Sequence, residues 1–166
     1  MRSMLSVVLV SLLVAAAPVH AQSSRAPAAA PAAAPTPQQR EAIARQDAQM
    51  AAAAARVANL IDTGKAGEVW DGASQVMRRS VARSAFQEGV QGDRARLGAL
   101  SGRGQPSVTR VQYANGAAVP AGTYLNVSFP SRFAASTQPV RELVSFRLDE
   151  DQVWRVSGYS VRAAGQ

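Results

Sequence analysis

The sequence predicts an α+β domain in which three N-terminal helices pack on a curved, four-stranded antiparallel meander sheet. Two observations carry this prediction. Apolar residues recur at helical spacing up to about residue 100, and after Gly102 they alternate with polar residues, as in strands with one buried face. Four strand-like runs then follow one another with only turns between them, so neighbouring strands should pair antiparallel.

The first segment of the chain has the layout of a secretory signal peptide. Arg2 supplies a positive charge, residues 5–14 are almost wholly apolar, and Val19-His20-Ala21 places small residues where a signal peptidase cuts. We therefore expect residues 1–21 to be removed and the protein to be exported, to the periplasm or the cell exterior. An uncleaved helix at the membrane is the alternative, but the apolar run is too short to form a stable membrane anchor.

Residues 22–38 are rich in proline, which blocks helix formation, and in alanine, which offers nothing large to bury. They are expected to form a disordered linker, or alternatively a spacer. A single α+β domain should occupy residues 39–163, followed by a short tail at residues 164–166.

Three helices are expected before the sheet. The first should run from about Gln38 to Asp62, because apolar side chains recur on one stripe of it, and Gly64 should end it. A shorter helix should follow, with Trp70 and Met77 on one face. A third should begin near Ser84, where the spacing is typical of a capping box.

The last of the four expected strands contains an irregularity. The first strand should start near Arg103 and include residues 109–113, and the others should lie around residues 125–129, 144–148 and 153–161. In strict alternation Trp154 and Tyr159 would point to opposite faces of the sheet. One extra residue at Ser157-Gly158 would return both to the buried face, so we predict a β-bulge there that curves the sheet.

Composition excludes several kinds of catalytic site. The chain has no cysteine, and its one histidine, His20, lies in the predicted signal peptide. A Ser-His-Asp triad, a thiol nucleophile and a zinc site of the usual ligands are therefore not expected in the mature protein. No metal and no cofactor are expected.

Glu142 is the carboxylate whose position indicates a special role, because it shares the buried face of its strand with Val144 and Phe146. An inward carboxylate needs a partner, and Arg103 is the candidate. Two interpretations remain open: a structural ion pair or polar anchor, and a general base inside a cavity.

Six side chains are expected to line any open pocket between the helices and the sheet. They are Trp70, Arg103, Tyr124, Glu142, Trp154 and Tyr159. Alternatively, the aromatic members are simply core residues, as aromatic residues at core spacing often are.

The net charge of +7 is unevenly distributed. Residues 78–110 contain seven arginines against only Glu88 and Asp93. Anionic lipid headgroups, an acidic glycan or a protein are the partners that such a surface fits, whereas nucleic acid is not expected because no aromatic residues interleave with the arginines. A merely solvated face is the alternative. The residues of the expected surface are Arg78, Arg79, Arg83, Arg94 and Arg96.

Several short motifs carry a family resemblance. They are Asp62-Thr63-Gly64 before Val69-Trp70-Asp71, then Gly122-Thr123-Tyr124, Val140-Arg141-Glu142, and the terminal Trp154-Arg155-Val156-Ser157-Gly158-Tyr159. Together they resemble a bacterial exported family described only as domain of unknown function 4019, although Phe86 stands where that family's third helix is expected to carry tryptophan. The resemblance implies no catalytic residues. The order of elements also resembles the cone-shaped nuclear transport factor 2-like and cystatin-like folds, which serve both enzymes and binders.

The sequence thus favours a non-catalytic, exported binding or interaction module whose ligand it does not identify. The alternative is a small cone-fold enzyme that uses Glu142 as a general base, with Tyr159 or Arg103 polarising the substrate.

Overall fold

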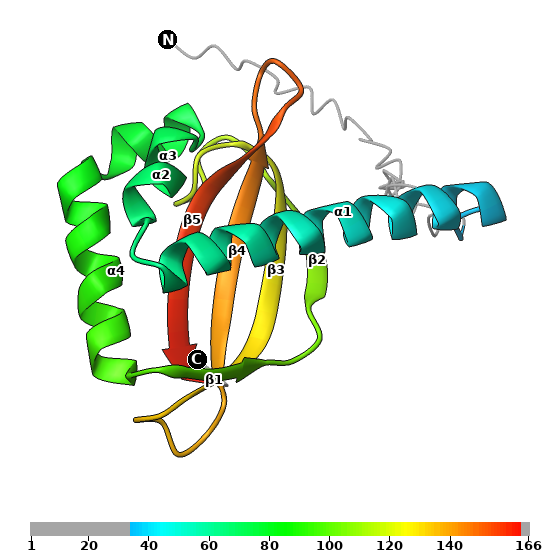
Figure 1. The fold of residues 1–166 in the computed structure, drawn as a ribbon. Helices are drawn as coiled ribbons and strands as arrows, with labels where there is room; N and C mark the ends of the chain where they lie inside the picture. The colour runs from blue at the N-terminus through cyan, green and yellow to red at the C-terminus, as the bar shows by residue number, and fades with distance from the viewer. Residues whose placement is uncertain (1–33, 164–166) are drawn as a thin grey trace, which may run out of the picture. The chain divides into compact units, whose positions relative to one another are not determined.

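The computed structural model describes residues 34–163, in which helices lie against one face of a five-stranded antiparallel sheet (Figure 1). The α+β class, with helices before the sheet, is confirmed. The predicted signal peptide, most of the predicted linker and the predicted tail lie outside the described residues. The elements are α1 (Pro37–Asp62), α2 (Ala66–Asp71), α3 (Gln75–Ser80), α4 (Arg83–Leu97), β1 (Leu100–Arg103), β2 (Ser107–Tyr113), β3 (Gly122–Phe133), β4 (Val140–Leu148) and β5 (Trp154–Ala163).

Helix α1 begins at a complete capping box. The Thr36 side chain accepts a hydrogen bond from the backbone N–H of Gln39, and the Gln39 side chain accepts one from the backbone N–H of Thr36. The helix then crosses the sheet and contacts β2, β3 and β4 (Figure 1). Residues 37–45 are exposed and extend past the edge of the sheet, so the second half of α1 provides its buried face.

The described part of the chain has one more helix and one more strand than the sequence predicted, because two expected elements are each divided. The expected second helix ends at Gly72 and restarts after Ser74, whose hydroxyl caps α3. The expected first strand is interrupted between Gly104 and Pro106, and both halves pair with β3. A Cβ atom at Gly104 would lie 2.7 Å from Cγ of Pro130, so the chain passes there too closely for a side chain.

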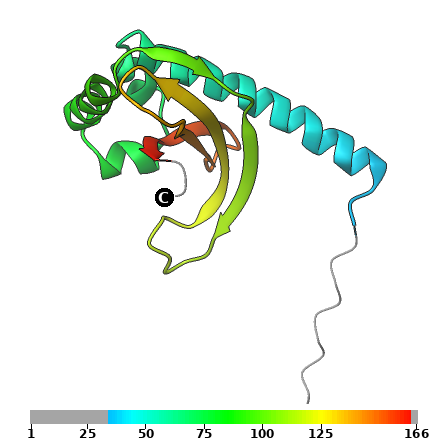
Figure 2. The same cartoon turned by 90° about the horizontal axis from the view of Figure 1, so that it is seen from below.

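The predicted β-bulge is confirmed. Ser145 pairs with Gly158, but Phe146 pairs with Val156, so Ser157 is the extra residue in β5. Trp154, Val156 and Tyr159 therefore share the face that packs against the hydrophobic core. The strands of the sheet curve along their length (Figure 2).

One hydrophobic cluster joins the helices to the sheet. Helix α4 contributes Phe86 and Val90 to it, so phenylalanine fills the position at which the family resemblance implied tryptophan. The core residues of the sheet are Leu125, Val127, Phe129, Val144, Phe146 and Val156. Among the helices of residues 34–163, none combines the length and the apolar character needed to cross a membrane.

Candidate functional site

Glu142 lies at the centre of a polar cluster beneath the helices. Strand β4 directs its side chain to the buried face, and its exposed fraction is 0%. Arg103, at the end of β1, donates two hydrogen bonds to it, from Nε to Oε2 at 2.5 Å and from Nη2 to Oε1 at 2.9 Å. The expected pairing of Glu142 with Arg103 is therefore present.

Two hydroxyl groups complete the coordination of this carboxylate. Ser131 on β3 donates to Oε2 at 2.8 Å, and Tyr159 on β5 donates to Oε1 at 2.7 Å. Each carboxylate oxygen of Glu142 thus accepts two hydrogen bonds, which uses the approximately four lone-pair sites that a carboxylate has. The bulge in β5 contributes to this arrangement, because without it Tyr159 would point to the other face.

A second carboxylate and a second arginine extend the cluster. Asp62, at the end of α1, accepts hydrogen bonds from Nη1 and Nη2 of Arg103 at 2.6 and 2.9 Å. Arg94 on α4 forms an ion pair with Asp62, and its Nη1 lies 3.7 Å from Oε1 of Glu142. The guanidinium of Arg94 also stacks over the ring of Phe133, 4.6 Å from its centroid. The positive charges of the two arginines therefore balance the negative charges of Asp62 and Glu142.

The surroundings fix the protonation states at neutral pH. Burial acts to raise the pKa of Glu142, but the hydrogen bonds from Arg103 and Tyr159 and the charge of Arg103 outweigh it and hold that pKa below its usual value. Burial raises the pKa of Tyr159, and the neighbouring charge of Glu142 raises it further. The carboxylate is therefore ionised and the phenol neutral, and neither is poised to transfer a proton.

A cleft of about 480 Å³ lies between the C-terminal end of α1, helix α4 and the start of β1. Its lining residues are Ile61, Asp62, Gly64, Ala66, Gln87, Val90, Gln91, Arg94, Ala95, Gly98, Ala99 and Leu100. Glu142 is not among them. Asp62 and Arg94 belong both to the cleft and to the polar cluster, and Nη1 of Arg94 is buried without a hydrogen-bond acceptor among the described residues.

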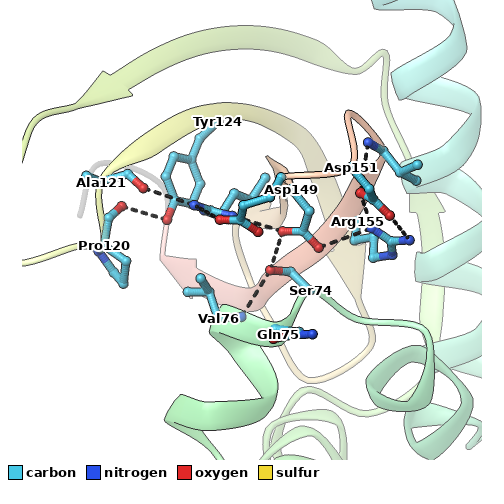
Figure 3. A network of polar contacts seen from close by, with 12 residues as sticks. Ser74, Gln75, Val76, Pro120, Ala121, Tyr124, Asp149, Asp151 and Arg155 are labelled. Atoms are coloured by element: carbon cyan, nitrogen blue, oxygen red, sulfur yellow. Dashed lines mark hydrogen bonds and ion pairs between the residues drawn. The ribbon is translucent and has the colours of Figure 1, made fainter.

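A second polar network joins the β4–β5 hairpin to the start of α3 (Figure 3). Asp149 is only 6% exposed, and its Oδ1 accepts hydrogen bonds from Ser74 at 2.8 Å and from Arg147 at 3.0 Å. Arg155 lies 3.3 Å from the other oxygen of Asp149 and also binds Asp151. The sequence does not reveal this network, because Ser74 and Asp149 are 75 residues apart in the chain.

The six residues expected to line a pocket are divided between different places. Arg103, Glu142 and Tyr159 meet in the polar cluster, as described above. The other three are Trp70, whose Nε1 donates to the carbonyl of Val81 at 2.9 Å, Trp154, and Tyr124. Trp70 and Trp154 pack against the core, whereas the Tyr124 hydroxyl binds the carbonyl of Pro120 within the second network (Figure 3). None of the six lines the cleft.

The five arginines expected to form an anionic-partner face also differ in environment. Arg94 is turned inward and only 15% of its side chain is exposed. Arg83 forms a bidentate pair with Asp71, and Arg96 pairs with Asp93 on its own helix. The remaining two, Arg78 and Arg79, are exposed on α3. Carboxylates therefore neutralise three of the five.

The comparisons with known proteins concern most of the domain. Residues 53–159 match a family model described as "Protein of unknown function (DUF4019)". No curated protein and no solved structure matches the chain. Within residues 34–163, no three potential metal ligands lie together as a metal site would require.

Proposed function

The chain belongs to the family described as Protein of unknown function (DUF4019), and on that premise we propose that it is a non-catalytic binding module that holds a small ligand in the cleft between α1, α4 and β1. The observation that carries the proposal is the state of Glu142. Its carboxylate is fully buried and already accepts four hydrogen bonds.

The enzyme alternative would need Glu142 as a general base. A general base must reach the proton that it removes, with a free lone pair and a pKa near the working pH. Glu142 lies outside the cleft lining, its lone pairs are occupied, and its pKa is lowered. These three properties favour a structural anchor that holds β1, β3, β4 and β5 together.

The cleft has the size and the chemistry of a ligand site. Pockets for small molecules commonly measure about 300–1,000 Å³ and combine apolar walls with a few polar groups. Here Ile61, Val90 and Leu100 supply apolar surface, and Gln87 and Gln91, one turn apart on α4, supply amides. Because Asp62 and Arg94 neutralise each other, the cleft favours an uncharged molecule with an apolar part.

A pair of matched substitutions tests the cleft. Ala95 and Ala85 are both exposed alanines on α4, but only Ala95 lines the cleft. A thermal-shift screen of neutral amphiphiles should yield a compound that stabilises the native protein and the Ala85→Trp variant, but not the Ala95→Trp variant. Equal binding to both variants, or no stabilisation by any compound, would contradict the proposal.

Export is part of the proposal, and its support is the signal-peptide pattern of residues 1–21. Intact-mass measurement on protein recovered outside the cytoplasm should show cleavage after Ala21. Full-length protein found only in the cytoplasm would contradict it.

A further inference from the structure

Three arginines lie close together on the face of the sheet that points away from the helices. Arg141 on β4 is the direct cross-strand partner of Arg162 on β5, and on its other side it pairs with Pro130 on β3. Arg132 follows two residues after Pro130 and so points to the same face. The residues between them, such as Glu142 and Ser131, are buried on the helix side. We call Arg132, Arg141 and Arg162 the arginine row.

The arginine row forms no ion pair among residues 34–163, and the carboxylate that shares a surface hollow with Arg162, Asp93, is paired with Arg96. All three side chains are exposed, and each of them lacks an ion pair or a side-chain hydrogen bond with another described residue. Like charges placed directly opposite on neighbouring strands destabilise a sheet. The fold thus keeps a repulsive Arg141–Arg162 pair in which neither side chain has an ion-pair partner in the described chain, which is expected where an external anion binds.

The surface next to the arginine row consists mainly of small polar side chains. The next positions along the same face are Ser107, Ser128, Leu143 and Ser160, followed by Thr109, Asn126, Ser145 and Gly158. In the part of the chain that the structure describes, the exposed large apolar side chains are Ile43 and Val153. Neither belongs to this face, and Leu143, which does, is half-buried, so the face offers no exposed large apolar side chain to insert into the apolar layer of a membrane.

We propose that the arginine row and the adjoining serines, threonine and asparagine bind an acidic polysaccharide. Guanidinium groups form bidentate hydrogen bonds with carboxylates, and the Cα atoms that carry them in the row are about 5–8 Å apart across neighbouring strands. The hydroxyl and amide side chains beside it suit the hydroxyl groups of sugar rings. This surface lies apart from the cleft, with which it shares no residue, and the inference does not depend on a cleft ligand.

The test compares two variants of equal net charge. The row variant carries Arg132→Gln, Arg141→Gln and Arg162→Gln. The control variant carries Arg40→Gln, Arg45→Gln and Arg56→Gln, three exposed arginines on α1 that belong neither to the row nor to the arginine surface expected from the sequence. Calorimetric titration with alginate, a polymer of uronic acids, at two salt concentrations should show binding that the row variant weakens by about ten- to a hundredfold. The control variant should bind within about twofold of the native protein.

Folding of the row variant can be checked independently. Its thermal stability should equal or exceed that of the native protein, because the repulsion between Arg141 and Arg162 is removed. The Ala95→Trp variant should bind alginate normally, which separates this inference from the function proposed for the cleft.

Three results would overturn the inference. Equal weakening of alginate binding in the row and control variants would mean that only net charge matters. If the native protein does not bind alginate, an acidic polysaccharide is not the ligand. Tighter binding to phosphatidylglycerol vesicles than to alginate, lost in the row variant, would replace the polysaccharide by a lipid surface.

Discussion

Replacing Glu142 by glutamine should destabilise the domain by about 3–5 kcal/mol at pH 7, because it breaks a buried ion pair and leaves the positive partner in place. The side chain is fully buried and accepts hydrogen bonds from Arg103, Ser131 and Tyr159. Glutamine has nearly the same shape, but its amide nitrogen is a hydrogen-bond donor. It would face one of the existing donors to Glu142 and leave that donor without an acceptor. Arg103 and Arg94 would then share Asp62 as their remaining counter-charge.

Urea unfolding measures this loss directly. The midpoint should fall while the slope stays constant, and the melting temperature should drop by roughly 10–20 °C for a domain of this size. The matched control is Glu88→Gln. Glu88 is exposed on α4 and forms no ion pair among the described residues, so its replacement should change the free energy of unfolding by no more than about 0.5 kcal/mol.

The pH dependence of the effect provides a second signature. Because the folded pKa of Glu142 is lowered from 4.5, its contribution to stability is fully present above the unfolded pKa and is lost as the pH falls through the folded pKa. The stability difference between the native protein and the Glu142→Gln variant should therefore shrink in acid. A variant as stable as the native protein at pH 7, or a difference independent of pH, would refute the reasoning.

Two further substitutions probe the polar networks. Tyr159→Phe removes a hydrogen-bond donor to the Glu142 carboxylate, so it should lower the free energy of unfolding by about 1.5–3 kcal/mol in urea at pH 7. The control is Tyr113→Phe, which should leave the free energy of unfolding almost unchanged, because the Tyr113 hydroxyl forms no hydrogen bond within residues 34–163. Equal losses in the two variants would argue against the polar cluster. Since burial raises the pKa of Tyr159 above its usual 10.0, stability should also fall above pH 10, and less so in Tyr159→Phe. Ser74→Ala removes both the cap of α3 and a hydrogen bond to buried Asp149, so thermal unfolding should show a loss of stability of about 1–3 kcal/mol. The exposed control, Ser80→Ala, should lose about 0.5 kcal/mol or less. Equal losses in the two variants would contradict the structure of the second network.

The fold was predictable where the information is local. The change from helical spacing to alternation marks the passage from α4 to the sheet, and the break in alternation at Ser157-Gly158 marks the bulge. The interruptions between α2 and α3 and between β1 and β2 also have local signals, at Gly72 and Pro106. Neither residue alone shows whether the helix or strand ends there or only bends.

The site was predictable only in part, because side-chain partners depend on tertiary contacts. An inward Glu142 requires a cation, which was enough to indicate Arg103. Asp62 lies 41 residues from Arg103 in the sequence, and nothing in the sequence shows that the end of α1 meets the end of β1. Arg94 was expected on the surface, but its side chain points to the cluster and pairs with Asp62.

The arginine row illustrates the same limit. Arg141 and Arg162 are on neighbouring strands, and only the register makes them direct partners. That register depends in turn on the bulge at Ser157, which shifts the phase of β5 relative to β4.

The most direct test of the central claim, that Glu142 is a structural anchor and not a general base, is to titrate its carboxyl group by ¹³C NMR in the folded protein. The structure predicts a pKa below 4.5, held down by its hydrogen-bond donors. A pKa above about 6, in the range that a general base needs at neutral pH, would contradict the claim.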